Sequence, residues 1–262
     1  MKVAIVTGGS SGIGLACCEK FLQNGYKVYE FSRKNGSDNK DIIHIKADVT
    51  DEQSVEQAVK TVFEAEGRID ILVNNAGFGI AGSIEETALA DAKKQFDVNF
   101  FGTVLCSQKV LPYMRKQGFG RIVNISSMAA PLAIPFQAFY SASKAAVNSL
   151  TLSMQNEVMP FGIIVCAVMP GDVKTGFTAA REKNSTDSAY SEVLNRSLSV
   201  MEHDEQNGMK PEAIADAVYK AATTKNPKPL STKGTQYHLF AVLSKVLPTG
   251  LVNRIVGQIY TK

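Results

Sequence analysis

The stretch TGGSSGIG at residues 7–14 decides the fold, because it joins a short apolar run to a helical pattern. The run VAIV occupies residues 3–6, and the helical pattern extends over residues 12–24. Glycines at such a junction let the chain turn sharply and let its backbone approach a phosphate closely. The first helical turn adds free N–H groups and the positive end of the helix dipole. The stretch therefore predicts a site for the pyrophosphate of a dinucleotide. The residues expected there are Gly8, Ser10, Ser11, Gly12, Ile13 and Gly14.

The spacing of these glycines is G-x-x-x-G-x-G, which differs from the better-known G-x-G-x-x-G. An ordinary turn between a strand and a helix is therefore the alternative interpretation. The position directly after the first strand favours dinucleotide binding.

Strand and helix patterns alternate beyond this turn. Apolar runs lie at residues 3–6, 27–31, 42–45, 69–73, 121–125 and 163–168. Helical patterns lie between them at residues 12–24, 51–66, 89–116 and 141–160. The runs are nearly continuous in apolar character, which is typical of parallel strands buried on both faces. We therefore predict an α/β protein, in which residues 1–262 form a single-domain Rossmann fold. Its sheet is doubly wound and parallel, with helices on both faces.

The pattern changes after Pro170. Residues 176–208 are polar and predict a mobile substrate loop that contains a short helix, and residues 211–223 predict an amphipathic helix. We expect the loop to close over a bound ligand, because lids are built from weakly packed segments.

Residues 235–262 are apolar again and predict a C-terminal helical extension, which Pro248 divides into two helices. The second helix carries an apolar stripe formed by Leu251, Val252, Ile255, Val256 and Ile259. We expect this stripe to cover the fold or to meet another subunit, because such stripes usually pack in a core. A helix lying on a membrane surface is the alternative, supported by Lys245, Arg254 and Lys262.

Composition narrows the class of protein. Twenty-eight Lys and Arg residues against 25 Asp and Glu give a net charge of +3 without a broad basic face, so no nucleic-acid partner is expected. The four cysteines have no C-x-x-C spacing, which argues against a zinc site or disulfides and indicates a reducing compartment. No apolar run approaches the length of a membrane span. We expect a cytoplasmic homodimer or homotetramer without a metal.

The end of the second strand predicts which dinucleotide binds. An acidic residue there would bind the ribose hydroxyls and repel a 2′-phosphate. This chain has Ser32, Arg33 and Lys34 instead, and Glu30 lies two positions earlier within the strand. Arg33 can hold a phosphate through paired N–H bonds, and Ser32 leaves space for it. The sequence therefore predicts NADP(H), although Arg33 and Lys34 could also be ordinary solvated charges.

Two later strand ends are expected at the same edge of the sheet, where doubly wound sheets bind ligands. Asp48 and Val49 follow the third strand and could bound the adenine pocket. Asn75, Ala76 and Gly77 follow the fourth, where small residues let the backbone pass beside the cofactor. For Asn74 and Asn75, a loop that bonds its own backbone is the alternative.

The stretch YSASK at 140–144 opens the helix that follows the fifth strand. Its spacing places Tyr140 and Lys144 on one helix face. A free tyrosine has a pKa of about 10, and a nearby ammonium lowers it. The pair could thus exchange a proton with a hydroxyl or a ketone. Ser126 and Ser127 end the fifth strand, where a hydroxyl could bond the substrate oxygen.

Together these features make the chain resemble the short-chain dehydrogenase/reductase family. The matching motifs are TGGSSGIG at 7–14, NNAG at 74–77, Ser127, YSASK at 140–144 and PGDVKT at 170–175. They stand in the family's order and at its spacing. The resemblance implies a nicotinamide-dependent oxidoreductase.

The resemblance also implies a role for each matching residue. Tyr140 matches the catalytic acid/base, and Lys144 matches the residue that binds the nicotinamide ribose and lowers the tyrosine pKa. Ser127 lies thirteen residues before Tyr140, the family's usual separation, and is preferred to Ser126. Asn99 matches the asparagine that holds a water in the proton relay to Lys144. Four residues match the segment that contacts the nicotinamide, namely Pro170, Gly171, Val173 and Thr175.

Two segments resemble one branch of the family. IPFQAF at 134–139 and GDVKT at 171–175 look like hydroxysteroid dehydrogenases and acyl-dihydroxyacetone-phosphate reductases, and the chain lacks the VDGG-like ending of many relatives. This implies a hydrophobic secondary alcohol or ketone, hydroxysteroid-like or lipid-like. The expected pocket wall is apolar and consists of Met128, Leu132, Ile134, Phe136, Phe177 and Tyr190. A reductase of an acyl-thioester or sugar carbonyl and a non-catalytic NADP-binding protein are the alternatives.

Overall fold

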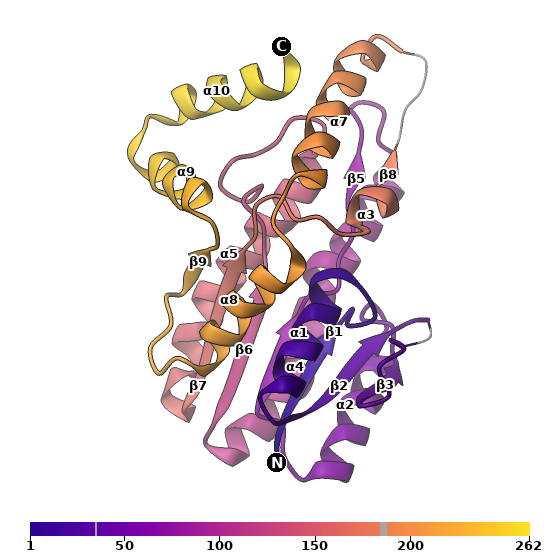
Figure 1. The fold of residues 1–262 in the computed structure, drawn as a ribbon, viewed down its shortest axis with the longest axis vertical. Helices are drawn as coiled ribbons and strands as arrows, with labels where there is room; N and C mark the ends of the chain where they lie inside the picture. Colours follow the sequence, from indigo (N-terminus) through magenta and orange to yellow (C-terminus); the bar gives the residue numbers. More distant parts are fainter. Residues whose placement is uncertain (35, 184–187) are drawn as a thin grey trace.

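The computed structural model describes residues 1–34, 36–183 and 188–262, and it is built around one parallel sheet (Figure 1). Seven strands follow the spatial order β3-β2-β1-β4-β6-β7-β9, and every neighbouring pair is parallel. Their bounds are β1 Lys2–Thr7, β2 Tyr26–Ser32, β3 Ile42–Lys46, β4 Ile71–Asn74, β6 Gly120–Ile125, β7 Ile163–Met169 and β9 Leu230–Thr232. The order reverses between β1 and β4, which confirms the predicted doubly wound Rossmann fold.

Helices cover both faces of this sheet. On one face, α1 (Gly12–Gln23) and α8 (Pro211–Thr223) pack on Ala4 and Val6 of β1. On the other face, α2 (Glu52–Glu66), α4 (Gly102–Gln117) and α5 (Ala138–Val158) pack around Val3 and Ile5. Successive residues of a strand point to opposite faces, so a strand covered on both sides needs an unbroken apolar run. For this reason the strands could be recognised in the sequence as apolar runs.

The predicted helix 89–116 consists of three joined segments. These are α3 Leu89–Phe96, a π-helical segment at Asp97–Phe101, and α4. π-Helical turns are rare and are frequent at functional sites. Here the turn carries Asn99, whose side chain is buried.

Three short strands escaped prediction. β9 extends the sheet beside β7, and β5 (Ile80–Ala81) pairs with β8 (Glu182–Lys183) in a separate small sheet. Runs of two or three residues are too short to show a period, and only their tertiary partners define them.

The prediction of a short helix within residues 176–208 was wrong in extent. The segment contains α6 (Phe177–Ala180) and the 16-residue helix α7 (Ser191–Gln206). The sequence of α7 is mostly polar, so its buried stripe of Leu194, Leu198 and Met201 gave only a weak signal. Residues 184–187 of the predicted loop lie outside the described residues.

The C-terminal extension forms the expected helix pair, α9 (Thr235–Val246) and α10 (Thr249–Thr261), interrupted at Pro248. Figure 1 shows the pair beyond the end of the sheet, and α10 packs on α7. The expected cover of the apolar stripe is incomplete within the described chain. Val256 is 7% exposed, whereas Leu251, Ile255 and Ile259 are 44%, 41% and 51% exposed. No helix among the described residues is both long and apolar enough to span a membrane.

Candidate active site

A cavity of about 1020 Å³ opens at the carboxyl edge of the sheet. It extends from the ends of β1 and β2, past α5 and α7, to the two C-terminal helices. Most residues that the sequence assigned to the cofactor and to catalysis line this one cavity. They are Gly8, Ser10, Ser11, Gly12, Ile13, Ser32, Arg33, Lys34, Asp48, Val49, Asn75, Ala76, Gly77, Ser127, Tyr140, Lys144, Pro170, Gly171, Val173 and Thr175.

The glycine-rich turn follows β1 as predicted. Gly8 and Gly12 have positive φ values of 65° and 55°, which residues with a Cβ rarely adopt. Ser11 precedes α1 without a side-chain cap, so the N–H groups of the first turn can receive an anion. Gly14 lies behind the cavity wall, where an added Cβ would come within 2.1 Å of the Gly8 carbonyl oxygen. Its role is the close packing of helix against strand.

The end of β2 carries the residues from which the sequence predicted the choice of dinucleotide. Glu30 is fully buried and pairs with His44, and it accepts a 3.2 Å hydrogen bond from the Ser32 hydroxyl. Arg33 lies across the cavity near Asp48. Burial alone would raise the pKa of Asp48, but hydrogen bonds from Thr50 and the charge of Arg33 hold it below its ordinary value.

The segment after β4 is fastened to the glycine-rich turn. The Thr7 hydroxyl accepts 3.0 Å hydrogen bonds from the backbone N–H groups of Asn75 and Ala76. The Asn75 amide donates to the carbonyl oxygens of Thr7 and Gly8 at 3.0 and 3.2 Å. The segment thus bonds a neighbouring strand end rather than its own backbone, and it fixes the floor of the cavity.

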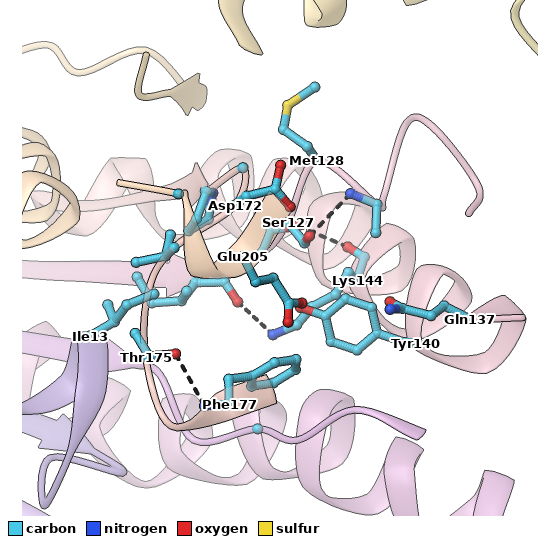
Figure 2. Close-up of a pocket in the computed structure, with 18 of the residues that line it drawn as sticks. Ile13, Ser127, Met128, Gln137, Tyr140, Lys144, Asp172, Thr175, Phe177 and Glu205 are labelled. Carbon is cyan, nitrogen blue, oxygen red and sulfur yellow. Dashed lines mark hydrogen bonds between the residues drawn. The ribbon is translucent and has the colours of Figure 1, made fainter. Parts of the chain in front are cut away.

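Tyr140 and Lys144 lie one turn apart on α5, and Ser127 follows β6 (Figure 2). The Lys144 Nζ is 5.8 Å from the Tyr140 ring centre and donates a 2.8 Å hydrogen bond to the Ile125 carbonyl oxygen. Burial raises the pKa of Tyr140 to about 12, although its hydrogen bond with Ser127 acts in the opposite direction. Burial lowers the pKa of Lys144 to about 8.

These shifts correct one expectation. We expected the lysine to lower the pKa of Tyr140, whereas the burial of the phenol dominates in this structure. Desolvation penalises both charged forms, the tyrosinate and the ammonium, so it raises the pKa of Tyr140, lowers that of Lys144 and moves the two values apart.

Asn99 lies behind Lys144 on the π-helical segment. Its amide oxygen accepts a 3.0 Å hydrogen bond from the Phe78 N–H. Its amide nitrogen donates to the Phe78 carbonyl oxygen at 3.0 Å and to the Ser143 hydroxyl at 3.2 Å. A Cβ on Gly77 would lie 3.0 Å from the Asn99 oxygen and 3.6 Å from the Lys144 Nζ. Gly77, Asn99 and Lys144 therefore lie close together, and a side chain at position 77 would crowd the Asn99 amide.

The segment after β7 closes the cavity opposite Tyr140. An added Cβ on Gly12 would lie 3.5 Å from the Cβ of Thr175, so this segment reaches the glycine-rich turn. The hydroxyl of Thr175 accepts a 3.2 Å hydrogen bond from the N–H of Phe177. The Phe177 ring centre lies 5.7 Å from that of Tyr140.

Two members of the expected apolar wall lie elsewhere. Phe136 packs against Ala81, Leu194 and Leu198, and the Tyr190 hydroxyl donates to Glu85 at 2.6 Å. Met128, Leu132, Ile134 and Phe177 line the cavity as expected. The error arose because a wall inferred from sequence order ignores which way each side chain turns.

Sequence reasoning missed the charged residues of the wall. Asp172, Asp204 and Glu205 all line the cavity, and Glu205 pairs with Arg181. Asp204 and Glu205 lie at the end of α7, which is longer than the short helix predicted for this segment, and no local pattern pointed to them. Asp172 belongs to the PGDVKT segment at 170–175, but the sequence of this segment does not indicate that its side chain lines the cavity.

Residues 2–186 match the model of a protein family described as short chain dehydrogenase. The chain belongs to the short-chain dehydrogenase family. It is therefore an oxidoreductase, and enzymes of this family use a nicotinamide cofactor. The glycine-rich turn with its uncapped helix start fits such a cofactor, as does the open cavity between that turn and Tyr140.

Several relatives span nearly the whole chain. It is 41% identical over 235 residues to the 3-ketodihydrosphingosine reductase of Bacteroides thetaiotaomicron, covering 88% of this chain and 87% of the relative. It is 30% identical to the NADPH-dependent 3-dehydrocapnine reductase of Ornithobacterium rhinotracheale, covering 97% and 96%. The crystal structure of a short-chain dehydrogenase from Streptomyces avermitilis superposes with a TM-score of 0.82 at 31% identity, covering 97% of each chain.

Proposed function

We propose that the protein is an NADP(H)-dependent reductase of long-chain ketones, with Tyr140 as the acid that protonates the carbonyl oxygen. The observation that carries this proposal is the continuity of the cavity. Beyond Tyr140 it passes between the C-terminal helices, where apolar side chains line it. They are Phe240, Leu243, Leu247, Val252, Ile255 and Ile259. An alkyl chain bound there would lie on side chains that are otherwise partly exposed to water.

The residues at the end of β2 support NADP(H). Arg33 and Lys34 line the cavity where a 2′-phosphate would lie, whereas Glu30 is buried and held by His44. A carboxylate that is buried and held in this way is not free to bind the ribose hydroxyls. A guanidinium at this place can bind a phosphate through two N–H groups.

A nicotinamide cofactor held between the glycine-rich turn and the segment after β7 would supply the hydride for the carbonyl carbon. Ser127 and Tyr140 donate hydrogen bonds to the carbonyl oxygen, and Tyr140 transfers its proton to that oxygen as the alcohol forms. These donors stabilise the transition state more than the ketone, because negative charge grows on the oxygen. Lys144 stabilises the resulting tyrosinate, and Asn99 orients the relay through which the proton is replaced.

Two relatives support a lipid-like substrate. The names 3-ketodihydrosphingosine reductase and 3-dehydrocapnine reductase both denote the reduction of a ketone on a long alkyl chain. We therefore take 3-ketodihydrosphingosine as the test substrate. Steroid ketones, acyl-thioesters and sugars form the comparison panel.

The test measures NADPH consumption by the purified protein on ketones of decreasing chain length. Each buried CH₂ contributes about 0.8 kcal/mol, so kcat/KM should fall about fourfold for each methylene removed. Equal kcat/KM over the series, or faster reduction of a thioester or sugar carbonyl, would refute the proposal.

A matched pair of variants on α9 locates the alkyl chain. Leu243 lines the cavity, whereas Leu239 on the same helix lies outside it and is 55% exposed. Leu243→Ser should reduce the preference for long chains, and Leu239→Ser should leave it unchanged.

A further inference from the structure

A carboxylate lies beside the hydroxyl of the proposed proton donor. Glu205, the penultimate residue of α7, lines the same cavity as Tyr140, and its side chain is 14% exposed. Figure 2 shows its carboxyl group at the hydroxyl end of Tyr140. The negative charge of Glu205 raises the pKa of Tyr140, as expected if the two groups are neighbours.

This carboxylate is held in place from behind. Glu205 pairs with the guanidinium of Arg181, whose side chain is 1% exposed. The Arg181 guanidinium carbon lies 5.8 Å from the centre of the Phe177 ring, and Phe177 packs against Tyr140. The Nε and Nη1 atoms of Arg181 have no hydrogen-bond partner among the described residues. Burying such a pair is costly and seldom adds stability, so its presence beside the reacting group calls for a functional reason.

Further acidic groups face this part of the cavity. Asp172 accepts a 2.7 Å hydrogen bond from the Tyr237 hydroxyl, and Asp204 lies 3.3 Å from the imidazole of the exposed His203. Burial, followed by the charges of Asp204 and Glu205, raises the pKa of Asp172. Three carboxyl groups thus accompany the single guanidinium of Arg181 in the described part of this wall, which gives it a negative character.

A negative charge at this position opposes the proposed chemistry. Proton donation turns Tyr140 into an anion, and a neighbouring anion makes that step harder. The charge of Arg181 lowers the pKa of Tyr140 and offsets part of this repulsion, but the effect of Glu205 is the larger one, and a neutral ketone adds no further compensation. A substrate that carries a positive charge next to its carbonyl would cancel the remaining repulsion, because its cation would lie between the carboxylate and the reacting oxygen.

We propose that the enzyme selects ketones with an ammonium group on the carbon next to the carbonyl, and that Glu205 binds this ammonium. Arg181 is then a positioning residue that aims the carboxylate. A carboxylate has about four acceptor sites, so Glu205 can bond Arg181 and an ammonium together. This inference rests on the proposed function and adds the substrate class: a 2-amino ketone at Tyr140 with its alkyl chain between α9 and α10.

The test compares two long-chain ketones that differ only in the amino group, each with wild type and Glu205→Gln. The substrates are 3-ketodihydrosphingosine and its analogue with hydrogen in place of the amine, at a pH where the amine is protonated. Hydrogen bonds to charged groups contribute about 1.5–3 kcal/mol, so Glu205→Gln should lower kcat/KM for the amino ketone about 10- to 150-fold. For the desamino ketone kcat/KM should stay the same or rise. Both substrates are measured on one preparation, so a partial loss of fold cancels in their ratio.

A matched control makes the same charge change on the same helix. Glu192 of α7 is 85% exposed and pairs with Arg196, away from the cavity. Glu192→Gln should leave the ratio of the two kcat/KM values unchanged.

A pH profile gives a second readout. With NADP⁺ and the desamino alcohol, activity rises as Tyr140 loses its proton. Glu205→Gln removes one of the charges that face Tyr140 and leaves Lys144 and Arg181 in place. The rising limb should therefore move to lower pH.

Three results would overturn the inference. They are no preference of the wild type for the amino ketone, equal losses on both ketones in Glu205→Gln, or an unmoved pH limb. Equal losses would show that Glu205 only supports the fold through Arg181. If the wild type reduces neither ketone with NADPH, the proposed function itself fails, which is a different outcome from a protein that reduces both ketones alike.

Discussion

Exchanging the residues after β2 should reverse the choice of cofactor. The double variant Ser32→Asp, Arg33→Ile removes the guanidinium that lines the cavity and adds a carboxylate in its place. Glu30 cannot take over the acidic role in the wild type, because it is fully buried and paired with His44. The variant therefore supplies the acidic residue that the wild-type cavity lacks at this position.

The size of the effect follows from the two changes. Losing charge-assisted hydrogen bonds from Arg33 costs about 1.5–3 kcal/mol, and an added charge about 4 Å away in a wet site costs about 1 kcal/mol. Because the losses fall on the same phosphate, NADPH should bind about 70- to 900-fold more weakly. NADH lacks that phosphate, so its affinity should fall little or improve.

Calorimetry of NADPH and NADH binding measures both changes directly. Lys40→Ile serves as the control, because Lys40 is an exposed cation in the same β2–β3 connection and does not line the cavity. An unchanged Kd for NADPH in the double variant would show that Arg33 does not touch the 2′-phosphate. Lys34 or a serine of the glycine-rich turn would then be the next candidate.

Three further predictions follow from the site. Tyr140→Phe keeps the ring against Phe177 but removes the proton donor, so turnover should fall about 10²- to 10⁴-fold while NADPH still binds; near-normal turnover would exclude Tyr140 from the reaction. Gly14→Ala places a Cβ 2.1 Å from the Gly8 carbonyl oxygen and should cost about 1–3 kcal/mol of unfolding free energy. In the same denaturation assay Gly257→Ala, inside α10 with open space around it, should leave the unfolding free energy unchanged or raise it by up to about 1 kcal/mol, because alanine favours a helix over glycine. The pKa of Lys144 is lowered to about 8 in the folded protein, so above this pH the unfolded chain keeps a proton that the folded protein has lost. The unfolding free energy of the wild type should therefore increase relative to that of Lys144→Met as the pH rises from about 8, and a constant difference between the two proteins would contradict this shift.

The sequence determined the sheet and the cofactor end of the cavity. In β1, Val3 and Ile5 face one helical layer, and Ala4 and Val6 face the other. Because both faces of the strand are buried, its sequence is an unbroken apolar run, which can be recognised without the structure. The glycine-rich turn was readable for a similar reason. At Gly14 the neighbouring backbone leaves no room for a side chain. The position therefore requires glycine, and that requirement is visible in the sequence without knowledge of distant contacts.

The tertiary structure decided the substrate end. Glu205 lies 65 positions after Tyr140, on a helix whose polar sequence marks no face as functional. Only the packing of Arg181 on Phe177, and of Phe177 on Tyr140, brings its carboxylate to the tyrosine hydroxyl. The same holds for the pKa of Tyr140. The spacing to Lys144 is local and favours a lowered value, but burial depends on the whole fold and raises it to about 12, because desolvation is the larger effect.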